Sequence, residues 1–139
     1  MPPQHLDQVL VDDPKLAEGL TAFGEFLRTS YFYPSGSYEK CEDSRAPNAW
    51  ATISKKFDPF IKRGMDEKNY KYFSIIRVTA TSSAYFELAD EEIAAIIPVR
   101  VIPGTTPQVS WKPLVPGYVT YVNRDFQVSA ALDFVLVTT

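Results

Sequence analysis

The sequence contains one histidine, His5, and one cysteine, Cys41, among its 139 residues. A chain with this composition cannot form an internal disulfide, and it lacks the imidazole and thiolate donors of the usual zinc sites. Any acid–base pair that needs a histidine must use His5, near the N-terminus, where catalytic geometry is difficult to hold. We therefore expect no metal and no cofactor, and we identify no catalytic residue.

Long hydrophobic runs and clustered glycines are also absent. No apolar run approaches the ~20 residues that cross a membrane, and the first residues lack the basic and apolar regions of a signal peptide. The six glycines are scattered and form no phosphate-binding loop. With a net charge of −3, broad binding to nucleic acid is disfavoured. We predict synthesis in the cytosol, no membrane association and no sequence-specific recognition of nucleic acid.

The N-terminal half carries two helical patterns. Asp13 and Pro14 form a typical helix start, with an N-cap and a proline at the first helical position. A second pattern begins near Asn48 and is interrupted at Pro59, which predicts a kink or two short helices. Apolar residues recur at helical spacing in both segments: Leu16, Leu20, Phe23 and Leu27 in the first, and Trp50, Ile53 and Phe57 in the second.

From residue 70 onward the pattern is typical of β-strands. Residues 126–136 alternate between apolar and polar side chains, the period of a half-buried strand. Pro98 lies inside an apolar run and suggests a strand at a sheet edge. The sequence predicts an α+β fold in which two N-terminal helices (about 14–30 and 48–63) pack on a mainly antiparallel β-sheet formed by residues about 70–138. We interpret residues 1–12 as an extended N-terminal arm and 13–139 as one domain.

Charge is distributed unevenly along the chain. Residues 97–139 contain five charged side chains among forty-three residues, whereas the first ninety-six residues contain the other twenty-six. Depletion of charge with enrichment of aromatic and aliphatic residues is typical of the centre of a protein interface. A core sheet covered by the chain's own helices predicts the same composition. Both explanations remain open on the sequence alone.

We favour a non-enzymatic structural subunit that associates with copies of itself or with other proteins of a large assembly. In size and order of elements the chain resembles accessory proteins of tailed-phage particles, such as tail terminators, tail subunits and capsid cement proteins. This resemblance implies a virion location and a role in a tail, a head–tail connector or a capsid. We predict that the subunit acts through its N-terminal arm, the proline-rich loop of residues 103–117 and the low-charge sheet. The predicted interface residues are Pro2, Pro3, Leu6, Val9, Pro107, Val109, Trp111, Pro113, Tyr118 and Tyr121.

Two other functions fit the sequence. Exposed aromatic residues, either Trp111 with Tyr118 and Tyr121 or the segment 31–38, are consistent with a small carbohydrate- or peptide-binding module. The second function is that of a small hydrolase that uses a pair of carboxylates, since any two of the seventeen acidic residues can meet in space. Cys41 is followed by Glu42 and Asp43, which disfavour the thiolate, so we predict an unreactive thiol.

Overall fold

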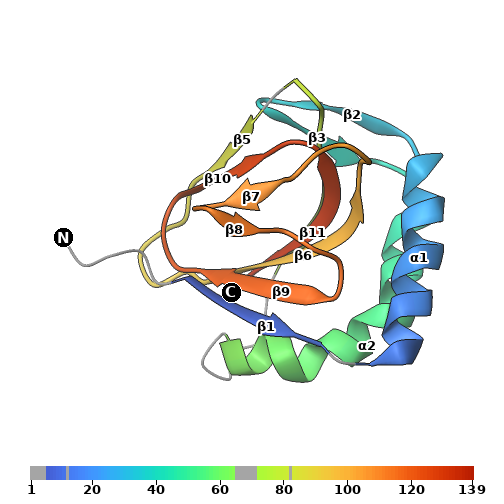
Figure 1. The fold of residues 1–139 in the computed structure, drawn as a ribbon, viewed down its shortest axis with the longest axis horizontal. Helices are drawn as coiled ribbons and strands as arrows, with labels where there is room; N and C mark the ends of the chain where they lie inside the picture. The colour runs from blue at the N-terminus through green and yellow to red at the C-terminus, as the bar shows by residue number, and fades with distance from the viewer. Residues whose placement is uncertain (1–5, 12, 65–71, 82) are drawn as a thin grey trace.

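The computed structural model describes residues 6–11, 13–64, 72–81 and 83–139, which form two helices and eleven strands (Figure 1). The helices are α1 (Pro14–Arg28) and α2 (Ala46–Gly64). The strands are β1 (Leu6–Leu10), β2 (Phe32–Ser35), β3 (Tyr38–Cys41), β4 (Tyr72–Val78), β5 (Ser83–Phe86), β6 (Ala94–Val101), β7 (Gln108–Val109), β8 (Lys112–Pro113), β9 (Tyr118–Val122), β10 (Phe126–Ser129) and β11 (Leu132–Thr138). Neither helix is long and apolar enough to cross a membrane.

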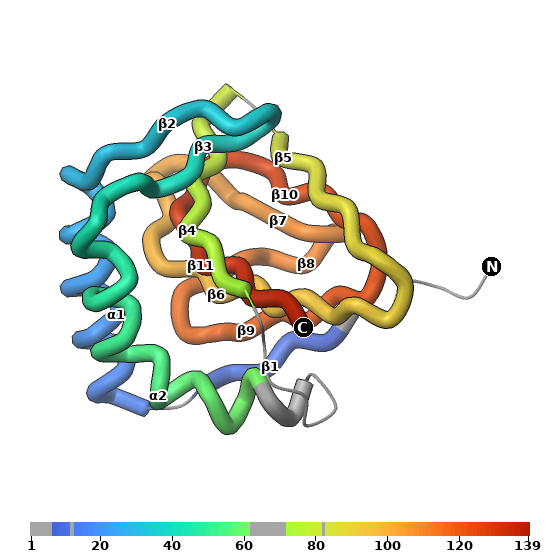
Figure 2. The backbone as a smooth tube through the Cα atoms, turned by 180° about the vertical axis from the view of Figure 1, so that it is seen from behind, coloured from blue at the N-terminus to red at the C-terminus, as the bar shows by residue number. Residues whose placement is uncertain are grey.

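The strands form two antiparallel sheets. The larger has the order β1-β9-β6-β11-β4-β3-β2 and the smaller the order β5-β10-β7-β8. From β4 to β11 the chain passes repeatedly between the two sheets, so that β4, β6, β9 and β11 lie in one and β5, β7, β8 and β10 in the other (Figures 1 and 2). These eight strands, β4 to β11, form a jelly roll, and β1, β2 and β3 extend its larger sheet.

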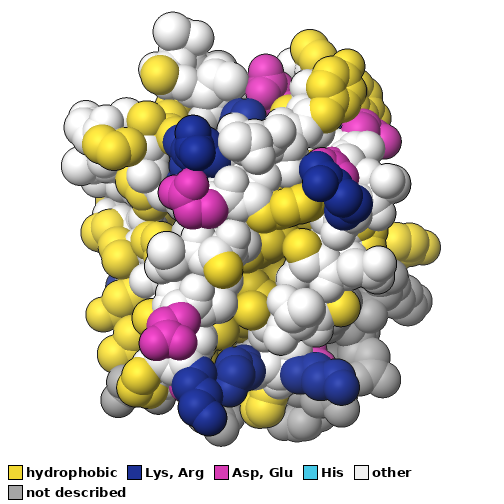
Figure 3. Space-filling view, turned by 90° about the vertical axis from the view of Figure 1, so that its right-hand side faces the viewer, with side chains coloured by type: hydrophobic (Ala, Val, Ile, Leu, Met, Phe, Trp, Pro, Cys, Tyr) yellow, Lys and Arg dark blue, Asp and Glu magenta, His cyan; other side chains and the backbone are white. Residues whose placement is uncertain are grey.

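The helices cover the larger sheet on the side away from the smaller one. The side chain of Asp13 caps α1 by accepting a hydrogen bond from the Lys15 amide at 2.9 Å. The apolar stripes of α1 and α2 then pack with Ile97, Val119 and Val135 of the larger sheet into one buried cluster. On the α1 side of the molecule, Lys and Arg side chains lie close to Asp and Glu side chains (Figure 3).

A second core lies between the two sheets. Its centre is aromatic: the Phe86 and Phe126 rings stack at 5.0 Å between centroids, and Phe134 meets Phe86 edge-on at 6.0 Å. Ile96 and Leu132 complete the layer from β6 and β11, and both are fully buried. Interlocking rings of this kind contribute large buried apolar area. The interior of the jelly roll is therefore filled by the chain's own side chains.

The predicted α+β fold class is wrong, because the molecule is mostly β-sheet and has two sheets rather than one. Residues 83–86, 108–113 and 126–129 form the second sheet, and all four of its strands have only two to four residues. Two-residue strands are too short to show a period of two, so the proline-rich segment resembled a loop. The helices cover the larger sheet only.

Pro98 does not mark a sheet edge either, because β6 lies between β9 and β11. Strand β9 pairs with β6 only along Ala94 to Ile96. Pro98 lies beyond these pairs, where its missing N–H removes no bond to β9.

Part of the predicted arm is an edge strand. Residues 6–10 form β1, which pairs antiparallel with β9 at one end of the larger sheet, opposite the end formed by β2 (Figure 2). The Gln8 side chain fixes this contact by donating to the Pro113 carbonyl at 2.8 Å and to the Thr120 hydroxyl at 2.9 Å. Residues 1–5 lie outside the described part of the chain.

Candidate functional site

The smaller sheet has one face that carries no helix in the described part of the structure. Along β5 and β10, alternate residues are buried and exposed, so one set points into the core and the other away from it. Tyr85 and Gln127 are cross-strand partners on the exposed side, and so are Ser83 and Ser129. We call this surface the outer face; its residues are Ser83, Tyr85, Gln108, Ser110, Trp111, Gln127 and Ser129. Six of them, all except Tyr85, line a hollow of about 400 Å³.

Trp111 dominates the outer face. Trp111 is 90% exposed, more than any other large hydrophobic residue in the described part of the chain. Ser110 and Trp111 form the turn between β7 and β8, and both have positive φ, 47° and 71°. A left-handed conformation costs roughly 1–2 kcal/mol for a residue with a side chain, and a bulky residue rarely adopts it. The chain therefore presents an indole ring to solvent on a strained turn.

The polar groups around Trp111 are uncharged. Gln108 and Gln127 contribute side-chain amides that make no hydrogen bond to the residues that the structure describes. The Ser129 hydroxyl is held by the backbone of Gln108, whose amide donates to it at 2.8 Å. None of the residues that line the hollow is Lys, Arg, Asp or Glu. The surface thus offers an aromatic ring with neutral donors and acceptors.

Tyr85 adds a second partly exposed ring, at 53% exposure. Its hydroxyl is 3.2 Å from Oδ2 of Asp125, whose other oxygen accepts from the Leu88 amide at 2.8 Å. The hydrogen bond to Asp125 raises the pKa of Tyr85 above the ordinary value of 10.0. Tyr85 therefore keeps its proton at neutral pH and stays an uncharged part of the outer face.

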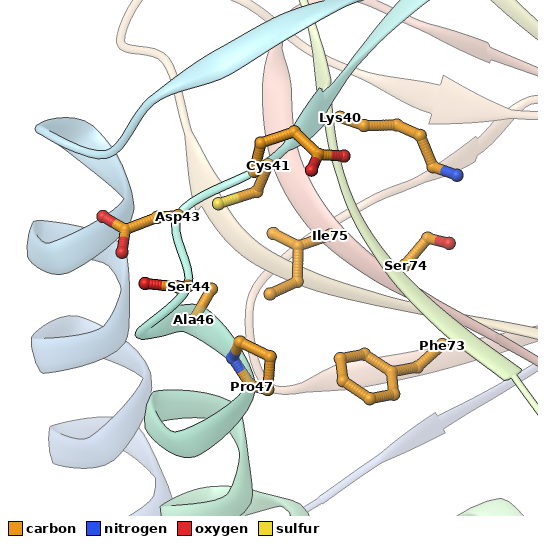
Figure 4. A pocket seen from close by; sticks show the side chains of 10 residues that line it. Lys40, Cys41, Asp43, Ser44, Ala46, Pro47, Phe73, Ser74 and Ile75 are labelled. Carbon is orange, nitrogen blue, oxygen red and sulfur yellow. The ribbon is translucent and has the colours of Figure 1, made fainter.

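A hollow of about 420 Å³ lies elsewhere, where the end of β3 and the start of α2 meet β4 (Figure 4). Burial raises the pKa of the Cys41 thiol, so the nucleophilic thiolate is disfavoured there. The Arg45 guanidinium lowers the pKa of Asp43 to about 2 through a hydrogen bond. Figure 4 shows the Asp43 and Lys40 side chains extending in opposite directions. These groups do not converge on a common point, and we assign no chemistry to this hollow.

The predicted interface residues are spread over several environments. Trp111 and Pro113 are exposed on the β7–β8 hairpin, whereas Val109 of β7 and Pro107, just before it, are buried. Val9 in β1 and Tyr118 in β9 are half-buried, and Leu6 pairs through its backbone with Val122. Tyr121 is buried, with its hydroxyl hydrogen-bonded to the Phe60 carbonyl, so the suggested platform of Trp111, Tyr118 and Tyr121 does not form. Pro2 and Pro3 lie outside the described residues.

The sequence predicted Trp111 alone among the outer-face residues and missed the other six: Ser83, Tyr85, Gln108, Ser110, Gln127 and Ser129. A signal was present, because Gln127 and Ser129 occupy the polar positions of an alternating strand. The missing information was which strand lies beside β10. Only the pairing of β10 with β5 and β7 brings these side chains next to Trp111.

No protein-family model and no curated protein sequence matches the chain. Among the solved structures that align with this chain are two prolyl hydroxylases. A prolyl-4-hydroxylase from Pseudomonas putida aligns with a TM-score of 0.56 and 11% identity over 97% of this chain and 90% of that one. The viral collagen prolyl hydroxylase of Paramecium Bursaria Chlorella virus-1, solved with 2OG, has a TM-score of 0.45 and 7% identity over 96% and 93% of the two chains.

These findings correct the predicted function. The fold of this chain is shared with the prolyl-4-hydroxylase from Pseudomonas putida, which is an enzyme and not a phage tail, connector or capsid protein. The prediction of a non-enzymatic virion subunit is therefore wrong. At 11% identity the likeness establishes the fold alone and transfers no residue role.

The residues of this chain do not fit the metal centre that such a fold implies. Non-haem iron oxygenases bind Fe(II) through two histidines and one carboxylate. This chain has one histidine, His5, which lies outside the described residues. Within the part of the chain that the structure describes, no three His, Cys, Asp or Glu side chains lie close enough to hold a metal ion. The space between the sheets is filled by Phe86, Phe126 and Phe134, and we derive no step through iron.

Proposed function

We propose that the outer face of the smaller sheet binds an extended, proline-containing polypeptide. The observation that carries this proposal is the Trp111 indole, 90% exposed on a strained turn and surrounded by neutral hydrogen-bonding groups. Backbone strain of this kind persists only where the surrounding structure holds it, and it clusters at ligand-binding positions.

The chemistry of the outer face complements a proline-rich chain. Such a chain adopts the polyproline II conformation, in which its backbone carbonyls are solvated and its proline residues carry no N–H donor. It therefore needs donors and apolar surfaces from its partner. The amides of Gln108 and Gln127 and the Nε1–H of Trp111 supply donors, and the indole supplies a flat apolar surface. Aromatic-lined grooves recognise proline-rich segments in this way.

The absence of charge favours the same ligand class. A site for an acidic or phosphorylated peptide would be lined by Arg or Lys, and the lining of this hollow contains neither. The structural neighbour from Pseudomonas putida is named for prolyl groups, which are polypeptide constituents. This supports a peptide ligand over a sugar.

The test is a titration of the labelled protein with a decaproline peptide, followed by two-dimensional amide NMR. We expect saturable shifts confined to residues 83–85, 108–111 and 127–129. Trp111→Ala should weaken binding by about tenfold or more, because exposed aromatic anchors contribute ~2 kcal/mol or more to such interfaces.

Tyr72→Ala is the matched control, because Tyr72 is also exposed, at 68%, but lies at the start of β4 in the larger sheet. This variant should bind decaproline as the parent does. Equal losses in the two variants would show nonspecific contact with surface aromatics and contradict the proposal. So would shifts that map elsewhere, or binding of a neutral glucan oligosaccharide to this face without any response to decaproline.

A further inference from the structure

Three arginines line a separate hollow of about 270 Å³ at the C-terminal end of α1. Arg28 is the last residue of α1, Arg77 lies in β4, and Arg100 lies in β6. The hollow is on the side of the larger sheet that faces the helices, because Asp133 points the same way as its β11 neighbours Val135 and Val137. It is therefore separate from the outer face.

A single buried carboxylate organises two of these arginines. Asp133 is completely buried, and its backbone lies between Arg77 and Arg100 in the sheet register. Its oxygens accept from Arg77 Nε at 2.7 Å and from an Arg77 terminal nitrogen at 3.1 Å, while Arg100 approaches at 3.4 Å. The bidentate pair fixes the position of the Arg77 guanidinium.

Arg77 is held on two further sides. The same terminal nitrogen that donates to Asp133 also donates to the Leu27 carbonyl at 2.9 Å, which ties Arg77 to the end of α1. The guanidinium carbon also lies 3.9 Å from the centre of the Phe32 ring. Arg77 is thus oriented before any ligand arrives, and side chains that are already ordered lose less entropy on binding.

The hollow has an excess of positive charge. The lining contains three arginines and no Asp or Glu. Arg77 and Arg100 share the buried carboxylate of Asp133, whereas Arg28 pairs with Glu25, a surface residue, 64% exposed, in a pair that contributes little. Arg100 makes a single long hydrogen bond, to Asp133, within the described part of the chain, so most of its donors remain available. Planar guanidinium groups with free donors match the oxygens of phosphate.

We infer that the hollow formed by Arg28, Arg77 and Arg100 binds a phosphate group. At neutral pH a phosphate monoester carries a charge between −1.5 and −2 and three acceptor oxygens, which suit guanidinium donors arriving from three sides better than the two oxygens of a carboxylate do. We identify the ligand only as a molecule that carries a phosphate group. Binding here would add an anionic ligand to a molecule whose outer face is neutral.

The experiment is a titration of the full chain with inorganic phosphate at constant ionic strength, observed through the side-chain Nε–H signals of the arginines. We expect saturable shifts at Arg28, Arg77 and Arg100. Arg100→Gln should weaken phosphate binding by about tenfold, because a hydrogen bond to a charged group is lost. Arg28→Gln, on the surface at the end of α1, should weaken it by a smaller factor and gives a readout even if the Arg100 variant does not fold.

Arg124→Gln is the control, since Arg124 lies in the turn between β9 and β10 and does not line the hollow. Its affinity for phosphate should equal that of the parent. Three results would overturn the inference: no saturable shift at tens of millimolar phosphate, an affinity unchanged in Arg28→Gln, or acetate binding as tightly as phosphate.

Discussion

The two sheets of this molecule differ in what covers their outward sides. The larger sheet has α1 and α2 on one face and the smaller sheet on the other, so Ala94–Val99 of β6 are all buried. The smaller sheet is covered on its inner face only, and its outer face exposes Trp111 and Tyr85. Both sheets contain few charged residues, yet for different reasons.

In the larger sheet, low charge follows from burial on two sides, because an unpaired charge there would be strongly destabilising. Its buried carboxylate, Asp133, is accordingly paired with two arginines. On the outer face of the smaller sheet, solvent would tolerate Lys or Glu, but the positions carry Gln, Ser, Tyr and Trp. The composition of this exposed surface is therefore not explained by folding, and it is the surface to which we assign binding.

The largest expected effect is at the core between the sheets. Phe134→Ala should lower the free energy of unfolding by about 3–5 kcal/mol, because the side chain is completely buried and its removal leaves a cavity. Chemical denaturation measures this loss. Phe134→Leu is the control and should cost less, since most of the volume is kept. A loss below about 1 kcal/mol in Phe134→Ala would mean that the two sheets do not pack on each other as described.

Next in size is the ion-paired carboxylate on the helix side of the larger sheet. Asp133→Ala should destabilise the protein by roughly 3 kcal/mol, because it leaves Arg77 and Arg100 partly buried without their carboxylate. Their side chains are 22% and 26% exposed, which places the effect at the lower end for buried pairs. Urea denaturation tests this. Asp133→Leu is the control, because it restores side-chain volume without the charge. It should be no more stable than Asp133→Ala if the lost charge causes the destabilisation. A clearly more stable Asp133→Leu would show that lost packing is the cause and contradict the prediction.

A smaller effect tests how closely the helices approach each other. A Cβ added at Gly19 would lie 2.7 Å from Cγ2 of Ile53, whereas one added at Gly24 would meet its neighbours at 3.5 Å or more. Gly19→Ala should therefore cost about 1–3 kcal/mol in strain, against roughly 1 kcal/mol gained from helix propensity. Gly24→Ala, the matched control, should be neutral or stabilising. Thermal unfolding that showed both variants equally stabilised would contradict the described packing of α1 on α2.

The local part of this architecture could be read from the sequence. Asp13, Pro14 and the stripe from Leu16 to Leu27 mark α1, because capping and helical periodicity are properties of a short segment. The alternation in 126–136 likewise marks β10 and β11. These signals do not state how the segments are arranged in space.

The second sheet could not be predicted for a physical reason. Strands β7 and β8 have two residues each, so their pairing is determined by the turn at Ser110 and Trp111 and by β10 rather than by their own pattern. The same applies to the candidate site, since Tyr85 of β5 and Trp111 of the β7–β8 turn come to lie on one face only because β10 pairs with both β5 and β7. The Arg77, Arg100 and Asp133 group depends on cross-strand register, which is also invisible in one segment.

The smallest expected effect on stability is at Trp111, and it sharpens the comparison most. A ring that is 90% exposed contributes little to folding, so Trp111→Ala should change the free energy of unfolding by less than about 0.5 kcal/mol. Trp111→Gly should be equally or more stable than Trp111→Ala, because φ of 71° suits glycine and the strain is relieved. Denaturation of both variants, together with their titration with decaproline, separates a role of Trp111 in folding from a role in binding. A residue that is dispensable for folding and required for binding would be retained for a ligand, whereas a loss of several kcal/mol in Trp111→Ala would show that the outer face is part of the folding core.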